Sequence, residues 1–184
     1  SDIRDIKIED LVNRSSVEPN NDLLSKNISN KRILISGGGG SIGSELVRQA
    51  LLQNPELVVV VDMDELSIFN LRNEHMYKDN LKIVLGSLND KENLRAIFKQ
   101  YHFNTVFHAA AYKHVSVVED NPLFGIMNNI NSTFNIAKLS NEFDVENFVL
   151  VSTDKAVKPS NYMGKSKLIS EMIVNYFSNL SDTR

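Results

Sequence analysis

Short apolar runs alternate along this chain with longer segments in which apolar residues recur at helical spacing. The runs predict strands and the longer segments predict helices. We expect strands at 32–36, 57–61, 81–85, 105–108 and 147–152, and helices near 41–53, 64–78, 90–100, 121–142 and 163–178. Alternation of this kind indicates a parallel sheet with right-handed crossovers. We therefore expect an α/β fold of the Rossmann type, a doubly wound sheet with strand order 3-2-1-4-5.

Residues 1–30 depart from this alternation. The apolar residues at 3, 6, 8, 11 and 12 predict a short helix or docking arm, and the stretch 15–30, rich in Ser and Asn, predicts a connection. The same residues also fit a leader that is foreign to the fold or partly disordered. We divide the chain into an arm and linker, 1–30, and one domain, 31–184.

Four glycines separate the first strand from the first helix, in RILISGGGGSIG. The spacing Gly38-x-Gly40-x-x-Gly43 is the general dinucleotide-binding pattern, and Gly37-x-x-Gly40-x-x-Gly43 is the short-chain dehydrogenase variant. Glycines allow a ligand to approach the backbone, and the N-terminus of the following helix favours an anion. A flexible connection is the alternative, but the flanking elements and the acid described next favour a phosphate site, with Ser41 and Ile42 at the start of the helix. We expect one buried face of this helix to carry Ile42, Leu46, Val47, Ala50 and Leu51.

An acid ends the second predicted strand. The uninterrupted apolar run 57–61, typical of a strand covered on both faces, leads to Asp62, 19 residues beyond Gly43. A carboxylate there accepts hydrogen bonds from the adenosine ribose hydroxyls and repels a 2′-phosphate, so we expect NAD rather than NADP. Asp64 and Glu65 could equally begin the next helix, and we assign Asp62 as ligand and Asp64 as cap.

Polar clusters also follow the third and fourth strands. Ser87 and Leu88 are placed to meet the adenine, whereas Asp90 fits a helix cap better. After the fourth strand come three small residues against which a flat cofactor could lie, and then a ring, a cation and an imidazole at the mouth of the site. These are Ala109, Ala110 and Ala111, followed by Tyr112, Lys113 and His114. We interpret His108 as a core or hinge residue.

The fifth strand is followed by Ser152-Thr153-Asp154-Lys155 and then by Met163-x-x-x-Lys167. Their hydroxyl, carboxylate and two amines can face one cleft. Taken singly, each fits a structural role, such as a turn cap, a solvated loop charge or a wet helix face. Taken together after a dinucleotide fingerprint, they indicate a catalytic cluster.

Composition limits the possible functions. The 184 residues are 42% hydrophobic and 23% charged, which is ordinary for one globular domain. A net charge of −3 gives no general attraction to nucleic acid or to an anionic membrane. The chain has no cysteine and four histidines, so we expect neither disulfides nor a metal site. It shows no signal peptide and no apolar stretch near the ~20 residues of a membrane span, and we expect a cytoplasmic location.

Several long motifs carry a resemblance to a known family. SGGGGSIGSEL, VFHAAAYKHV, NPLFGIMNNINSTFNIA, FVLVSTDKAVKPSNYMGKSK and the leader IRDIKIEDLVNR resemble the CapD-like polysaccharide biosynthesis proteins. These form the UDP-N-acetylhexosamine 4,6-dehydratase branch of the extended short-chain dehydrogenases. The resemblance implies an NAD-dependent enzyme that serves bacterial surface polysaccharides, oxidises the sugar at C4, eliminates water across C5 and C6, and returns the hydride to C6.

The resemblance also implies a longer protein. In that family the leader follows a membrane-anchored region, and the catalytic domain continues into a sugar-binding lobe. We expect this chain to be truncated before that lobe, to make no membrane contact itself and to be inactive alone. The full-length protein is expected at the inner face of the cell membrane, as a homo-oligomer.

Roles for individual residues follow from the resemblance. Lys155 would be the base for the C5 proton, Asp154 would protonate the departing C6 hydroxyl, and Thr153 would hydrogen-bond the C4 oxygen. A partly desolvated lysine and a carboxyl kept protonated in a closed site suit those tasks. Lys167 would hold the nicotinamide ribose and lower nearby pKa values. Lys113 and His114 would face the sugar or its diphosphate. Asn129 would support the geometry of the site.

Three positions depart from the family's pattern. Met163 stands where most short-chain dehydrogenases have tyrosine, so removal of the C4 hydroxyl proton falls to Asp154, Lys155 or a water, with Tyr162 as a further candidate. Ser87 replaces an aspartate near adenine, and Ser132 replaces a common glycine. Two rival hypotheses remain: an NAD-dependent nucleotide-sugar epimerase or reductase, and an NAD-binding module without turnover.

Overall fold

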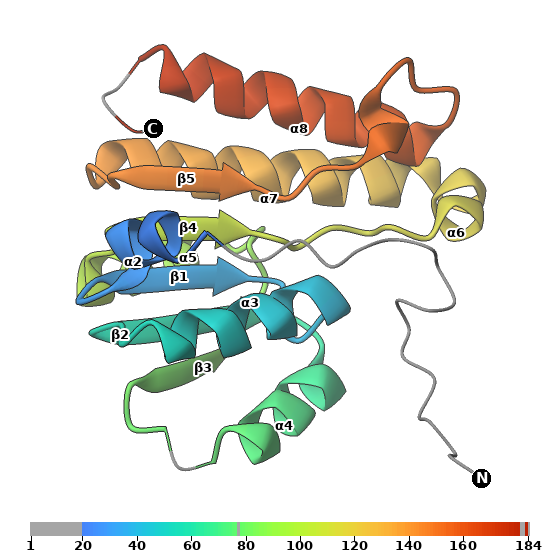
Figure 1. The fold of residues 1–184 in the computed structure, drawn as a ribbon. Helices are drawn as coiled ribbons and strands as arrows, with labels where there is room; N and C mark the ends of the chain where they lie inside the picture. The colour runs from blue at the N-terminus through green and yellow to red at the C-terminus, as the bar shows by residue number, and fades with distance from the viewer. Residues whose placement is uncertain (1–19, 77, 181–182, 184) are drawn as a thin grey trace, which may run out of the picture.

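Five parallel strands form a single sheet in the order β3-β2-β1-β4-β5 (Figure 1). The computed structural model describes residues 20–76, 78–180 and 183, so the arm predicted at 3–12 lies outside the described residues. The strands are β1 (Arg32–Ser36), β2 (Leu57–Asp62), β3 (Leu81–Leu85), β4 (Thr105–His108) and β5 (Asn147–Leu150). The predicted fold class and strand order are confirmed.

Helices cover both faces of the sheet (Figure 1). In chain order the helices are α2 (Asn21–Ile28), α3 (Ser41–Leu52), α4 (Glu65–Glu74), α5 (Lys91–Tyr101), α6 (Val115–Asp120), α7 (Pro122–Glu142), the 3₁₀ turn η1 (Asp154–Ala156) and α8 (Tyr162–Ser178). Side chains of α2, α3 and α4 form the core on one face, and those of α5 and α7 form it on the other. α8 packs against α7 and η1, which places it beside the end of β5.

The middle positions of the central strands are apolar because both faces of these strands are covered. Val58 and Val60 of β2 join the core on the α3 face, whereas Val59 and Val61 join the core on the α5 face. All four side chains are fully or almost fully buried. The side-chain alternation of a strand therefore divides one valine run between two cores.

The structure corrects parts of the element prediction. The stretch 15–30, read as a connection, contains α2, which begins where the Asn20 side chain accepts a hydrogen bond from Leu23 N at 3.1 Å. Its Ile28 is buried against the sheet. Two short elements, α6 and η1, were not predicted. The strand expected at 147–152 ends at Leu150, and the helix expected at 64–78 ends at Glu74.

Other boundaries agree within one residue, and two caps are confirmed. Asp64 accepts from Leu66 N at the start of α4, and Asp90 accepts from Asn93 N at the start of α5. Among the described residues, no helix combines the length and the apolar character needed to cross a bilayer.

Candidate functional site

The glycine loop fits its neighbours so closely that side chains are excluded. Gly37 adopts φ 71°, in the left-handed region, and a Cβ there would lie 2.6 Å from the backbone N of Ala110. A Cβ on Gly43 would lie 2.0 Å from the carbonyl oxygen of Gly37. The loop thus brings the start of α3 against the end of β1, and the N-cap of α3, Gly40, contributes no side chain to its first N–H groups. An anion can reach those groups directly.

Gly43→Ala should lower the free energy of unfolding by about 1–3 kcal/mol, the usual cost of overpacking a tight contact. The added methyl would meet backbone atoms of Gly37 and Gly38, which cannot rotate away. Gly86→Ala is the matched control, since a Cβ there meets only Val84 Cγ1 at 4.0 Å. Urea denaturation of both variants checks this expectation, and equal stabilities would contradict it.

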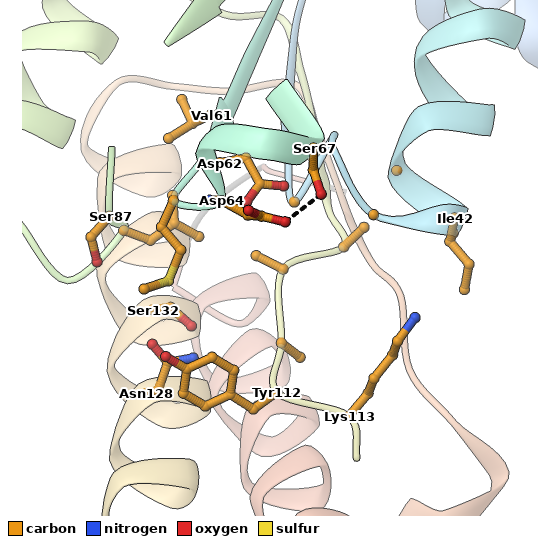
Figure 2. A pocket seen from close by; sticks show the side chains of 18 of the residues that line it. Ile42, Val61, Asp62, Asp64, Ser67, Ser87, Tyr112, Lys113, Asn128 and Ser132 are labelled. Carbon is orange, nitrogen blue, oxygen red and sulfur yellow. Dashed lines mark hydrogen bonds between the residues drawn. The ribbon is translucent and has the colours of Figure 1, made fainter. Parts of the chain in front are cut away.

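Asp62 is held in place by two backbone N–H groups. Its Oδ2 accepts from Gly39 N at 2.9 Å and its Oδ1 accepts from Asp64 N at 3.0 Å. Each carboxylate oxygen keeps a lone pair that a ribose hydroxyl can use. The neighbouring Asp64 is engaged differently, because the Ser67 hydroxyl donates to its carboxylate (Figure 2).

A cavity of about 260 Å³ opens where the glycine loop, the end of β2 and the loops after β3 and β4 meet (Figure 2). It lies at the carboxyl ends of the strands, where open α/β sheets bind their ligands. Eleven residues assigned to the cofactor line it: Gly37, Gly40, Ser41, Ile42, Gly43, Asp62, Ser87, Leu88, Ala109, Ala110 and Ala111. Ile42 is 57% exposed, so the prediction that it lies on the buried face of α3 is wrong. At the first turn of α3 its side chain belongs to the cavity wall instead.

Nine further wall residues were not assigned to the cofactor: Val61, Met63, Asp64, Ser67, Gly86, Tyr112, Lys113, Asn128 and Ser132. Asn128 comes from α7, and its Oδ1 accepts from Asn89 Nδ2 at 3.0 Å. Ser132, noted only as a departure from the family's glycine, also lines the cavity one turn further along α7. Figure 2 shows the Tyr112 ring beside Asn128 at the side of the cavity opposite Asp62. The asparagine pair 128–129 inside a largely apolar helix was the available signal for Asn128.

Lys113 and His114 lie at the border of a second depression. Lys113 lines both this depression and the cofactor cavity, whereas His114 lines only the second one. This depression, about 400 Å³, lies between the loop after β4, α6 and the start of α7, and its wall includes Val117, Val118 and Phe124. A cation and an imidazole therefore stand beside an apolar surface next to the cofactor cavity.

Asn129 is buried and connects the loop after β4 to two helices. Its Oδ1 accepts from Tyr112 N at 2.7 Å, and its Nδ2 donates to Tyr112 O at 3.0 Å and to Ser166 Oγ of α8 at 2.9 Å. The side chain thus fixes the backbone that leads into Lys113. The resemblance implies that Asn129 supports the geometry of the site, and that role stays a prediction.

His108 is fully buried, as expected of a core histidine. Its Nδ1 lies 2.7 Å from Ser36 Oγ and its Nε2 lies 3.0 Å from Thr133 Oγ1. Thr133 donates its own proton to Asn129 O at 2.8 Å, so Nε2 is the protonated nitrogen and Nδ1 accepts from Ser36. Burial, with a smaller contribution from the nearby Lys167 charge, lowers the pKa of His108 to about 3.

Lys167 is 7% exposed and does not line the cofactor cavity. Its Nζ donates to Val151 O at 2.7 Å, just after the end of β5. Burial lowers the pKa of its ammonium group, and the carboxylate of Glu171 opposes that effect. Four residues earlier on the same helix, the Met163 side chain is also buried.

Thr153, Asp154 and Lys155 form the turn η1 and its cap. Thr153 Oγ1 accepts from Lys155 N at 3.4 Å and donates to Asp154 Oδ1 at 3.0 Å. The side chains of Asp154 and Lys155 are exposed and do not line the cofactor cavity. The desolvation expected for Lys155 and the closed surroundings expected for Asp154 are therefore not provided by the described residues, because η1 packs mainly against α8.

Together, the strand order, the glycine turn, the acid after β2 and the cavity between them define an α/β domain of the Rossmann type. Residues 33–184 match the family described as polysaccharide biosynthesis protein. The chain belongs to this family.

Curated relatives include both dehydratases and epimerases. The chain is 38% identical to the capsular polysaccharide biosynthesis protein CapD of Staphylococcus aureus, over 95% of this chain and 30% of that protein. It is 34% identical to a UDP-N-acetylglucosamine 4,6-dehydratase (inverting) of Campylobacter jejuni, over 84% of this chain and 46% of that protein. It is 33% identical to a UDP-glucose 4-epimerase of Rickettsia rickettsii, over 78% of this chain and 42% of that protein. The chain spans less than half the length of each of these relatives.

Solved structures share the fold. The structure of Pen from Bacillus thuringiensis superposes with a TM-score of 0.79 at 31% identity, covering 85% of this chain and 49% of that one. WbmG from Bordetella bronchiseptica, solved with NAD and UDP, has a TM-score of 0.69 at 24% identity, covering 84% of this chain and 51% of that one. At this level of identity, the similarity to WbmG shows a shared fold only.

Proposed function

We propose that this chain is the NAD-binding part of a UDP-N-acetylhexosamine 4,6-dehydratase that serves polysaccharide biosynthesis. The observation that carries the proposal is the placement of Thr153, Asp154 and Lys155 after β5, beside Lys167, at the sheet edge that holds the dinucleotide cavity. A hydroxyl, a carboxyl and an amine next to a hydride acceptor suit a reaction that combines oxidation with elimination. Similarity to the Campylobacter dehydratase supports the same reading.

The residues around the cavity fit NAD. The close packing at Gly37 and Gly43 brings the start of α3 to the cavity, where no side chain caps its first N–H groups and a diphosphate can bind them. The fixed carboxylate of Asp62 can accept from a ribose diol. Bound NAD would supply the hydride acceptor for C4 of the sugar and the hydride donor for C6. The protein must then orient the sugar, exclude water and move protons.

Proton movement is assigned to the turn after β5. Thr153 donates to the C4 oxygen, Lys155 takes the C5 proton, and Asp154 gives a proton to the departing C6 hydroxyl. Oxidation at C4 makes the C5 proton acidic, which places it within reach of an amine base. Because Asp154 and Lys155 are exposed here, the bound sugar and the groups that cover it must supply the desolvation that this chemistry needs.

The proton on the C4 hydroxyl needs an acceptor other than Met163. A thioether cannot take up a proton, and the Met163 side chain is buried. Asp154, Lys155 or a water therefore performs this step. Tyr162 is the further candidate for this step. Its side chain is exposed, and the centre of its ring lies 5.2 Å from Lys165 Nζ.

We expect NAD to bind at least ~10-fold more tightly than NADP, because a 2′-phosphate would meet the Asp62 carboxylate as a like charge. Asp62→Asn should reduce the preference for NAD over NADP, since it removes the charge repulsion while keeping the size of the side chain. Asp79→Asn, at an exposed position, is the control. Titration calorimetry with both dinucleotides measures the ratio, and equal or tighter NADP binding by the unchanged chain would contradict the assignment of Asp62.

An epimerase or reductase is the second candidate. The similarity to the Rickettsia epimerase supports it, because epimerisation at C4 uses the same oxidation and the same cofactor. The dehydratase needs an acid and a base, the roles proposed for Asp154 and Lys155, to eliminate water across C5 and C6. Epimerisation involves no such elimination and would leave those two roles unused. A cofactor-binding module without turnover is the third possibility.

One experiment separates all three. The complete catalytic domain is incubated with UDP-N-acetylglucosamine and NAD, and the products are followed by NMR. A 4-keto-6-deoxy sugar supports the dehydratase. A C4 epimer or a reduced sugar would instead indicate the second candidate, and unchanged substrate despite bound NAD would indicate a binding module.

A further inference from the structure

One face of α8 holds two consecutive residues of the segment that joins β5 to η1. Lys167 Nζ donates to the backbone oxygen of Val151 at 2.7 Å. One helical turn later, the carboxylate of Glu171 accepts from the hydroxyl of Ser152. The sequence alone did not predict a role for Glu171, because glutamates are common on amphipathic helices.

The two contacts come where the chain leaves the sheet. Leu150 is the last residue of β5. Just beyond it, Val151 N donates to His108 O at 2.9 Å, which is a backbone hydrogen bond to the end of β4. Thr153, which caps η1, follows directly after Ser152. Glu171 thus binds the residue that connects the rigid strand to the turn carrying Asp154 and Lys155.

Glu171 also lies next to the Lys167 charge. Burial lowers the pKa of Lys167, and Glu171 acts in the opposite direction. The other charged or titratable groups on the elements packed against α8 are Asp154 and Lys155 on η1, Glu119 and Asp120 on α6, and Lys138 and Glu142 on α7, and His108 lies on the nearby strand β4. His108 is neutral, and the carboxylate of Glu119 accepts from Tyr162 N, at the start of α8.

We propose that Glu171 is a positioning residue: its hydrogen bond to Ser152 fixes the turn Thr153–Lys155, and its carboxylate lies one helical turn from the Lys167 ammonium group, which binds the preceding residue, Val151. The consequence for turnover rests on the proposed function. The consequences for the turn and for Lys167 concern this chain alone.

Two variants separate the hydrogen bond from the charge. Ser152→Ala removes the bond and leaves the carboxylate in place. Glu171→Gln keeps an acceptor oxygen for Ser152 and removes the negative charge. Glu142→Gln is the control, because Glu142 is also a helical glutamate whose carboxylate binds a neighbouring element: at the end of α7 it pairs with Arg95 of α5.

Two measurements on this chain test the idea without any assay of catalysis. NMR of lysine side chains labelled at Cε, with the Lys167 signal assigned by its loss in Lys167→Arg, reports the pKa of Lys167. We expect Glu171→Gln to lower that pKa, because the opposing negative charge is lost, and Ser152→Ala to leave it nearly unchanged. Hydrogen exchange of the Ala156 and Val157 amides, which bond to Thr153 O and Asp154 O, should become at least ~5-fold faster in Ser152→Ala.

Turnover by the complete catalytic domain gives a third readout. Glu171→Gln should move the alkaline limb of the pH–rate profile to lower pH. Ser152→Ala should lower kcat by roughly 10-fold at every pH while the KM for NAD stays constant. If neither the Lys167 pKa nor the amide exchange differs from that of Glu142→Gln, Glu171 has no positioning role. If both change but the domain forms no dehydratase product, the positioning role stands and the proposed function fails.

Discussion

Lys155→Ala and Asp154→Asn should each slow conversion of UDP-N-acetylglucosamine by at least ~100-fold in the complete catalytic domain, the scale of a lost acid or base. NAD affinity should change by less than about 2-fold, because neither side chain lines the dinucleotide cavity. Steady-state rates from NMR, with NAD affinity from calorimetry, give both quantities. The combination of lost turnover and retained binding is what assigns these side chains to chemistry rather than to the cofactor site.

Lys165→Ala is the control for the lysine variant. Lys165 is also exposed, it lies on α8 two residues before Lys167, and it contacts the Tyr162 ring rather than η1. It should keep near-normal turnover. Near-normal rates in Lys155→Ala or Asp154→Asn would show that the proton-transfer roles are misassigned.

The free energy of unfolding should fall by about 2–3 kcal/mol between pH 7 and pH 4.5 through His108 alone. Its pKa is depressed from 6.5 in the unfolded chain to about 3 in the folded one, mainly by burial. A histidine shifted in this direction binds a proton more readily when unfolded. Its contribution to stability is therefore complete above pH 6.5 and is lost progressively as the pH falls toward 3.

Comparison of variants isolates this contribution from that of the carboxylates. His108→Gln should be less stable at pH 7 and should lose the part of the pH dependence between 7 and 4.5 that comes from position 108, since a glutamine side chain does not titrate. His75→Gln, at the end of α4, should retain the slope of the parent chain. Urea denaturation at several pH values measures both slopes, and identical slopes for the parent and His108→Gln would refute the assignment.

The sheet was predictable because its signals are local and redundant. Each of the three central strands is an apolar run with polar residues at its ends, and each crossover has helical spacing, so element type and strand order followed from pattern alone. The prediction failed where stability comes from contacts that sequence spacing does not show. The Ser- and Asn-rich composition before Lys31 concealed α2, which depends on the Asn20 cap and on the burial of Ile28.

The site was predictable to the extent that it depends on backbone. The sequence could predict that Gly37, Gly43 and Asp62 meet at one cavity, because a close turn and the end of a strand leave few alternatives for residue type. Asn128 and Glu171 were missed, since their importance comes from neighbours contributed by other elements, Asn89 and Ser152. The exposure of Lys155 was also unpredictable, because burial of a loop side chain depends on what packs over it.

The interface between α7 and α8 determines how precisely Lys167 is placed. It contains Asn129, Thr133, Ser166 and Ser170, all buried and all joined by hydrogen bonds. Among the described residues, no buried side-chain nitrogen or oxygen lacks a partner. If α8 slid along α7 by one helical turn, about 5.4 Å, these groups would lose their partners at about 1–3 kcal/mol each. An interface of leucines would tolerate such a shift far better, because leucines have no hydrogen bonds to lose. These polar contacts therefore fix the register of α8 along α7, as a single buried asparagine does in a coiled coil.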